Sequence, residues 1–267
     1  MIELYQEGDQ PQALLDGMKL HLLKKKQTNS WKTSKATAAA CYAFLLDAEH
    51  WLADTASLDV RFTQSGDVAL PTPKTSTGYQ KITLAPEEMT QDKQHLMITN
   101  PNEGVAWGGV YVQYFEDLDK ITHSVDEPVQ LAKSLYKVGV DNNGDVAIPL
   151  DAGETLSPGD RLRVRIEMTV DRPMEFMVLK DMRSSGLEPV NVLSQYKWQD
   201  GLGYYESTRD VATYFYFERI PKGNFVFEYD VRAAHAGEFS NGIVQLQSMY
   251  APEFSSHSEG VSLRIVK

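Results

Sequence analysis

The sequence is poor in cysteine and has no long apolar run, and each absence removes a class of protein. Cys41 is the single cysteine among 267 residues, which excludes an internal disulfide framework and any zinc site built on several thiolates. No apolar stretch approaches the ~20 residues that a helix needs to cross a bilayer. The first residues, Met1–Leu4, also lack the basic start and apolar stretch of a signal peptide. We therefore expect a soluble chain that does not insert into membranes.

Positive charge is scarce as well. The chain has 26 Lys and Arg against 37 Asp and Glu, which gives a formal net charge of −11. Neutralising phosphates requires clustered Lys and Arg, so nucleic acid is a poor candidate partner. The run Lys24–Lys26 fits better as the basic end of a helix, where it meets the negative pole of the helix dipole. The sequence also lacks Gly-rich phosphate loops and nucleotide or kinase fingerprints, so we expect no cofactor.

The remaining composition is that of a globular protein. Apolar residues make up 42% and charged residues 24% of the chain, which is enough apolar material for real cores. The length predicts two domains or three small ones.

Residues 1–53 are predicted to be helical. One helical stripe gathers the apolar residues Leu14, Leu15, Met18, Leu22 and Leu23. A cap signal at Ser30–Ser34 precedes an alanine-rich run, Ala36–His50, which is apolar on several sides. Two helices and a helical stub cannot bury such surfaces alone. We therefore expect a piece of a larger helical assembly, whose exposed apolar faces favour self-association.

The pattern changes to β after Asp54. The predicted strands of this part are Leu58–Phe62, Lys81–Leu84, His95–Thr99 and Val105–Phe115, followed by a linker near Thr122–Pro128. Strands recur from Lys133 onward, at Arg161–Val170, Val211–Ile220, Phe225–Arg232, Ile243–Tyr250 and Val261–Val266. Arg161–Val170 has the clearest alternation of apolar and polar residues. Its apolar residues share one face of the strand, namely Leu162, Val164, Ile166, Met168 and Val170. Many short strands without intervening helices predict an antiparallel sandwich.

The residues that could carry chemistry each have a simpler structural explanation. Cys41 lies mid-helix among alanines, which favours a buried structural cysteine over a reactive thiolate. The six histidines are His21, His50, His95, His123, His235 and His257. None of them forms a pair at a metal-binding spacing, although a site assembled in space remains open. We therefore predict no catalytic, cofactor-binding or metal-ligating residues.

The segment Met249–Gly260 is the densest in functional groups. Its Glu253, His257 and Glu259 could act as acid and base, or His257 could pair with a neighbouring serine. However, no Gly-x-Ser-x-Gly elbow accompanies the segment, and adjacent residues of one loop rarely form a triad. We interpret it as a polar loop that closes the sandwich. The polar stretches Tyr204–Asp210 and Lys180–Arg183 are interpreted as ordinary pleated strands with charged faces.

Several stretches resemble one family, the bacterial alpha-2-macroglobulins. The text HLLKKKQTNSWKTSKATAAACYAFLL, His21 to Leu46, resembles the last helices of the toroidal thioester-type domain. The text WGGVYVQYFEDL, Trp107 to Leu118, is similar to the strand that closes the CUB-like β domain. Three further texts, VLKDMRSSGLEPVN, GLGYYESTRD and SNGIVQLQSMYAPEFSSHSEG, look like the terminal macroglobulin domain.

The resemblance implies a domain order and a function. It divides the chain into the end of an α/α toroid (1–53), a CUB-like domain (54–122) and a terminal macroglobulin-like sandwich (123–267). The fold class is thus mainly β with N-terminal helices, in which antiparallel sandwich domains follow a truncated toroid. The chain is expected to be a non-catalytic scaffold of an envelope protein that traps proteases. Its partners would be the rest of the parent chain and, through the parent, proteases.

Two features of the family are missing from the sequence. Neither the bait region nor the Cys-x-Glu-Gln thioester motif is present, and both would lie upstream of Met1. No functional residue of the family is therefore carried over. Two other classes stay open, namely a carbohydrate-binding or adhesive sandwich with Trp198, Tyr204 and Tyr205 as its aromatic platform, and an enzyme using Glu253, His257 and Glu259.

Overall fold

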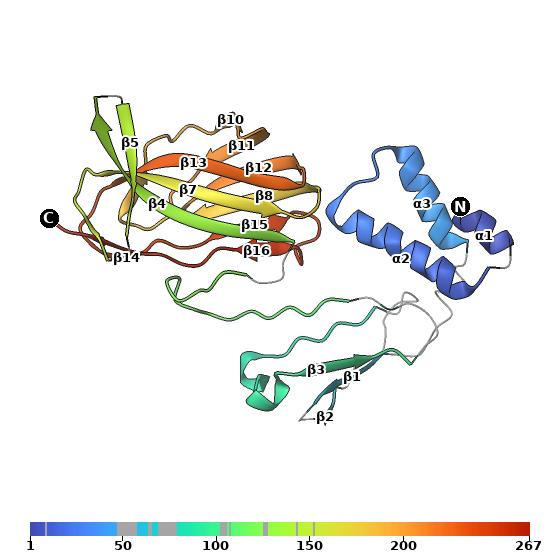
Figure 1. Ribbon diagram of the computed structural model, residues 1–267. Helices are drawn as coiled ribbons and strands as arrows, with labels where there is room; N and C mark the ends of the chain where they lie inside the picture. The colour runs from blue at the N-terminus through green and yellow to red at the C-terminus, as the bar shows by residue number, and fades with distance from the viewer. Residues whose placement is uncertain are drawn as a thin grey trace. The chain divides into compact units, whose positions relative to one another are not determined.

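The computed structural model describes most of the chain. The described residues are 1–8, 10–46, 58–63, 66–68, 79–101, 106, 108–124, 128–142, 144–151 and 153–267. They form two compact units, one of Met1–Lys25 with Trp31–Val110 and one of Lys26–Ser30 with Tyr111–Lys267. Figure 1 labels most of the elements of both units.

The N-terminal segment is helical, as predicted. Its elements are α1 (Ile2–Glu7), α2 (Gln12–Thr28) and α3 (Ser34–Leu45). The side chain of Thr33 accepts a hydrogen bond from the backbone N of Ala36 at 3.1 Å, so the predicted cap signal is confirmed. His50, the predicted end of α3, lies outside the described residues.

The predicted apolar stripe of α2 is only partly correct. Leu15 is buried, whereas Leu14 is 45% exposed. The buried face of α2 is formed by Leu15, Asp16 and Lys19, and Lys19 is 0% exposed. Leu14 points about 100° away from Leu15, on the side away from Asp16, and so lies at the margin of this face.

The short strands that follow pair into a small antiparallel sheet. Its order is β2 (Gly66–Asp67), β1 (Asp59–Phe62) and β3 (Leu96–Thr99). Two single 3₁₀ turns, η1 (Pro86–Glu88) and η2 (Gln91–Lys93), precede β3. The strands predicted at 58–62 and 95–99 are therefore confirmed.

Two other predicted strands are wrong. Lys81–Leu84 and the described part of Val105–Phe115 have no strand structure, and Val105 and Trp107 lie outside the described residues. A strand exists only where a neighbour takes up its backbone hydrogen bonds. Among the described residues these segments have no pairing strand. Phe115 is consequently fully exposed.

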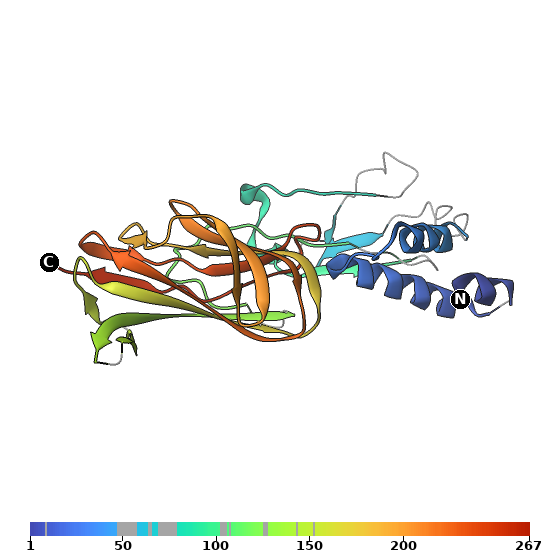
Figure 2. The same ribbon diagram turned by 90° about the horizontal axis from the view of Figure 1, so that it is seen from above.

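The rest of the chain is a two-layered β-sandwich, visible edge-on in Figure 2. The larger sheet has the order β10 (Gln195–Gln199), β11 (Leu202–Thr208), β12 (Ala212–Ile220), β8 (Met174–Met182), β15 (Val244–Ser248), β16 (Ser255–His257). The second sheet has the order β5 (Gly144–Pro149), β4 (Val129–Asp141), β7 (Arg161–Val170), β13 (Gly223–Ala233), β9 (Leu187–Pro189). A small third sheet joins β14 (Gly237–Ser240), β17 (Ser262–Ile265) and β6 (Thr155–Leu156). Within the two large sheets all described pairs are antiparallel.

Strand β7 occupies the centre of the second sheet, between β4 and β13. All five apolar residues predicted to share its inner face are buried. Fully burying one such side chain contributes about 1.5–3 kcal/mol relative to exposure. The opposite sheet meets them with the rings of Phe215 and Phe217. The prediction of an antiparallel sandwich with N-terminal helices is thus confirmed.

Candidate functional site: the polar cluster and surfaces of the sandwich

A buried ion pair crosses the interior of the sandwich. Lys133 on β4 and Asp181 on β8 belong to different sheets, and their Nζ and Oδ1 atoms are 2.5 Å apart. Their side chains are 1% and 0% exposed. The Lys133 ammonium also donates to the carbonyl oxygens of Met182 at 2.9 Å and Asn241 at 3.1 Å. Three acceptors satisfy the three ammonium donors, as a buried charge requires.

Tyr229 completes the cluster from a second strand of the opposite sheet. Its hydroxyl, on β13, donates to Oδ2 of Asp181. Burial raises the pKa of Tyr229 well above its ordinary value, and the charge of Asp181 raises it further. The phenol therefore stays protonated and remains a donor. Asp181 thus ties β8 to both β4 and β13.

Next to this cluster, Arg183 anchors a loop. Its guanidinium donates to the hydroxyl of Thr213 at 3.3 Å and to the carbonyl oxygens of Asp210, at 2.8 Å, and Arg209. The stretch Lys180–Arg183 therefore begins as the predicted pleated strand. Its alternate charged residues, however, point inward as structural anchors.

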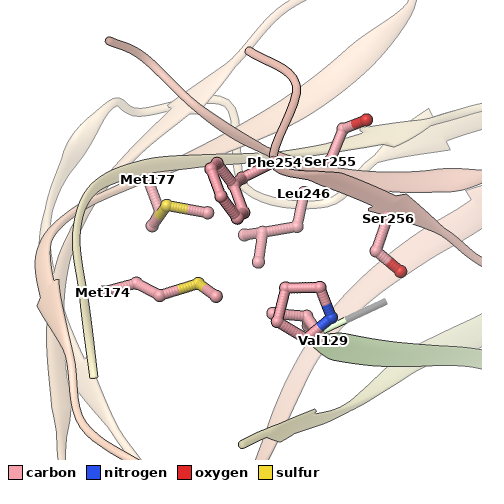
Figure 3. A pocket seen from close by; sticks show the side chains of 8 residues that line it. Val129, Met174, Met177, Leu246, Phe254, Ser255 and Ser256 are labelled. Carbon is pink, nitrogen blue, oxygen red and sulfur yellow. The ribbon is translucent and has the colours of Figure 1, made fainter. Parts of the chain in front are cut away.

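The side chains of Lys133 and Asp181 are closed off from solvent. Figure 3 shows a separate apolar hollow of the sandwich, lined by Met174, Met177, Leu246 and Phe254. Its volume is about 10 Å³, which is room for a single water molecule. The contacts among Lys133, Asp181 and Tyr229 therefore serve to hold the two sheets together, and we call these three residues the clamp.

Two serine hydroxyls, one within the segment Met249–Gly260 and one just before it, make hydrogen bonds with the backbone. Ser248, just before it, accepts from the backbone N of Ala251 at 3.2 Å. Ser258 accepts from the backbone N of Val244 at 3.0 Å. Within the described residues no hydrogen bond joins Glu253, His257 and Glu259 to one another. The contacts fit the interpretation as a loop that closes the sandwich, and residues 255–257 also form β16.

A preceding segment, Leu118–Ser124, lies along this loop, and we call it the strap. The backbone N of Gly260 donates to the carbonyl of Ile121 at 2.9 Å, and that of Ser124 donates to the carbonyl of His257 at 3.0 Å. A Cβ at Gly260 would lie 1.6 Å from the carbonyl oxygen of Leu118. Only glycine therefore permits this approach of the two backbones.

The end of α2 contributes a further contact within the same compact unit. The backbone N and the hydroxyl of Ser30 donate to Oε2 of Glu175 at 2.9 and 2.5 Å. A hollow of about 250 Å³ adjoins these two residues and is also lined by Phe176, Ser248 and Tyr250.

The predictions for the cysteine and for one aromatic residue are wrong. Cys41 is free and exposed, because it points about 100° away from the buried Ala40 around the axis of α3. Tyr204 is buried, and its ring centroid lies 5.4 Å from that of Phe215. It therefore belongs to the core and cannot be part of an exposed platform. Burial raises its pKa to about 12.

The histidines and acidic residues of the described segments do not gather into a metal centre. No group of three or more His, Cys, Asp or Glu side chains within those segments could hold a metal ion. The helices of the same segments include none that is both long and apolar enough to span a membrane.

Comparison with known proteins finds similarity over the sandwich. The family description "Bacterial Alpha-2-macroglobulin MG10 domain" matches residues 129–253. A curated protein of Nostoc sp., the "Alpha-2-macroglobulin homolog", is 28% identical over 144 residues, which cover 50% of this chain and 7% of that protein.

Two solved structures of bacterial alpha-2-macroglobulins are similar to this chain. The chain is similar to trypsin-activated alpha-2-macroglobulin from Escherichia coli, with a TM-score of 0.50 and 11% identity, over 100% of this chain and 18% of that one. Salmonella alpha-2-macroglobulin reacted with methylamine matches 54% of this chain and 9% of that one, at 17% identity and a TM-score of 0.42. This chain thus spans less than a fifth of the length of each of these relatives.

Proposed function

We propose that this chain, whose residues 129–253 belong to the bacterial alpha-2-macroglobulin MG10 family, is the non-catalytic C-terminal scaffold of a protease-trapping protein. The match of the sandwich to that domain family carries the proposal. The antiparallel sandwich and the similarity to much longer relatives agree with it. The parent protein would reside in the cell envelope.

The proposed domain division follows the order of the elements. Residues 1–53, with α1 to α3, would end an α/α toroid. Residues 54–122, with β1 to β3, would be a CUB-like domain, and residues 123–267 the terminal macroglobulin-like domain. The MG10 match lies wholly within the last of these ranges.

The exposed apolar residues around position 112 support a role as an interdomain contact surface. Tyr111, Val112 and Tyr114 are each more than 70% exposed. Contiguous apolar surface of this kind marks an interface in soluble proteins. Packing against another part of a parent chain would cover these side chains, and backbone pairing with a strand there would give the segment the strand structure that its sequence favours.

The first experiment is an immunoblot of source-cell fractions with an antibody raised against this chain. We expect a band several times larger than 30 kDa in the envelope fraction. A band at the size of this chain in the cytoplasm would contradict the proposal.

A second experiment tests the trapping itself. The parent protein is incubated with a protease, and residual activity is measured on a small peptide and on a large protein substrate. A trapped protease should still cleave the peptide while it loses access to the protein. Equal inhibition of both activities, or of neither, would contradict trapping.

A further inference from the structure

Five aromatic side chains share the outer face of three neighbouring strands at one edge of the larger sheet. They are Tyr196 and Trp198 on β10, Tyr205 on β11, and Tyr214 and Tyr216 on β12. Their strand neighbours Tyr204, Phe215 and Phe217 are buried in the core. Because successive side chains of a strand point to opposite faces, these five point outward. We call this set the aromatic face.

The register of the strands places these rings side by side. Tyr196 is opposite Tyr205, and Tyr205 is opposite Tyr216, so three rings lie in one row across β10, β11 and β12. The ring centroids of Tyr196 and Tyr205 are 5.0 Å apart. The rings of Tyr214 and Tyr216 are 6.2 Å apart with planes only 12° from parallel. The rings therefore form a continuous surface.

Trp198 extends this surface over a glycine. It is opposite Gly203 in the register, and a Cβ at Gly203 would lie 2.8 Å from Cε3 and Cζ3 of the indole. The indole thus fills the space where a side chain at position 203 would stand. Trp198 is nonetheless 76% exposed, and Tyr196 is 83% exposed. Core packing does not explain two large aromatic side chains at such exposure.

The polar groups of the aromatic face are free to bind a ligand. Within the described part of the chain, none of the four tyrosine hydroxyls makes a hydrogen bond. Charge at the margin is balanced, since Lys180 lies 6.0 Å from the Tyr214 ring centroid and Glu218 follows Tyr216 on the same side of β12. In a chain of net charge −11, this face is a nearly neutral area of rings and hydroxyls.

We propose that the aromatic face binds a neutral β-1,4-linked glycan strand of the peptidoglycan type. The C–H groups on one face of a pyranose ring stack on aromatic rings, and the sugar hydroxyls exchange hydrogen bonds with phenols. Tyr196 and Tyr205 meet edge to face, with their planes 66° apart. A row of rings that crosses three strands suits an extended glycan, because successive sugars along the glycan can each contact a ring. A charged ligand would find no matching charge here. The glycan class follows from the face itself, and the choice of peptidoglycan rests on the proposed envelope location.

The test uses the full chain and two probes, chitohexaose in isothermal titration and insoluble peptidoglycan in a retention assay. We expect both to bind. Trp198→Ala and Tyr205→Ala should each weaken chitohexaose binding about tenfold, because each removes a stacking ring. Tyr114→Ala is the matched control and should leave binding unchanged, since Tyr114 is 73% exposed and lies outside the aromatic face. Circular dichroism checks that every variant is folded.

Several outcomes would overturn the proposal. These are the absence of chitohexaose binding at millimolar concentration, affinity that survives Trp198→Ala, or retention on cellulose without retention on peptidoglycan. Dimerisation of the chain that Trp198→Ala abolishes would assign the face to a second copy instead. Protease trapping by the parent protein is measured separately in the Trp198→Ala variant, so failure of glycan binding and failure of the proposed trapping remain distinguishable.

Discussion

Lys133 and Asp181 show how two side chains can specify the way two sheets meet. A buried ion pair adds little net stability, because desolvation of both charges offsets their attraction. Removal of one partner alone is costly, since the other charge stays buried without compensation. The pair therefore selects the arrangement in which β4 and β8 face each other.

Lys133→Met should consequently lower the free energy of unfolding by about 3–5 kcal/mol, as measured by urea denaturation. The double variant Lys133→Met with Asp181→Asn should recover part of that loss, because no charge stays buried and the amide oxygen still accepts from the Tyr229 hydroxyl. Lys137→Met is the control, because the Lys137–Asp160 pair is 2.7 Å long but its lysine is 41% exposed, so it should cost under about 1 kcal/mol. Equal losses at positions 133 and 137 would contradict the clamp.

Tyr204 gives a pH-dependent prediction at the same scale. Its pKa is raised to about 12 by burial, whereas the unfolded chain titrates tyrosine near ~10. Between these values the folded state keeps a proton that the unfolded state releases, so stability is fully present below pH ~10 and falls as pH rises toward ~12.

Denaturation at several pH values tests this effect. Tyr204→Phe should remove up to about 2 kcal/mol of the decline between pH ~10 and ~12. The hydroxyl also donates to Gln199 at 3.1 Å, so a constant offset between the two proteins is expected as well. Curves that stay parallel across the range would show that Tyr204 does not carry the effect.

At the scale of elements, the alternation of apolar and polar residues correctly predicted the strands that are paired with a neighbouring strand on both sides. β7 is paired on both sides, so its inward residues face a core and its pattern is strict. The segment around 105–115 also has a composition that favours strands, but it has no described partner strand. The strand predicted there from composition alone was therefore wrong. Likewise, the sequence pattern placed Tyr204 and Tyr205 together on one exposed aromatic platform. Only the register of the strands shows that Tyr205 faces solvent and Tyr204 faces the core.

The strap is the element whose placement depends on one residue. A methyl group at Gly260 would collide with the carbonyl oxygen of Leu118, and overpacking of this kind typically costs about 1–3 kcal/mol. Gly260→Ala should therefore release residues 118–124 and speed their cleavage in limited proteolysis. Gly139→Ala is the control, because a Cβ there meets nothing within 4 Å. Equal cleavage of both variants would contradict this account of the strap.

At the scale of the whole molecule, the sequence predicted the family better than any site. The resemblance rests on many short texts spread along the chain, whereas a site requires side chains that the fold brings together. The inward charges of Lys133 and Asp181 lie 48 residues apart and carry no local motif. The aromatic face likewise depends on a register across three strands, which no single segment encodes.

The apolar residues exposed on the helices lead to a last prediction for the whole chain. Leu4 and Leu45 are 69% and 66% exposed, and Tyr42 is 52% exposed. Such side chains favour association, so light scattering should show dimers or larger species at micromolar concentration. A chain that starts at residue 54 should be more nearly monomeric. It keeps the exposed residues around position 112 and the aromatic face, so the comparison separates the helices from these two areas. A monomer in both cases would show that none of the three areas drives association, and association that survives the truncation would assign it to the segment around position 112 or to the aromatic face.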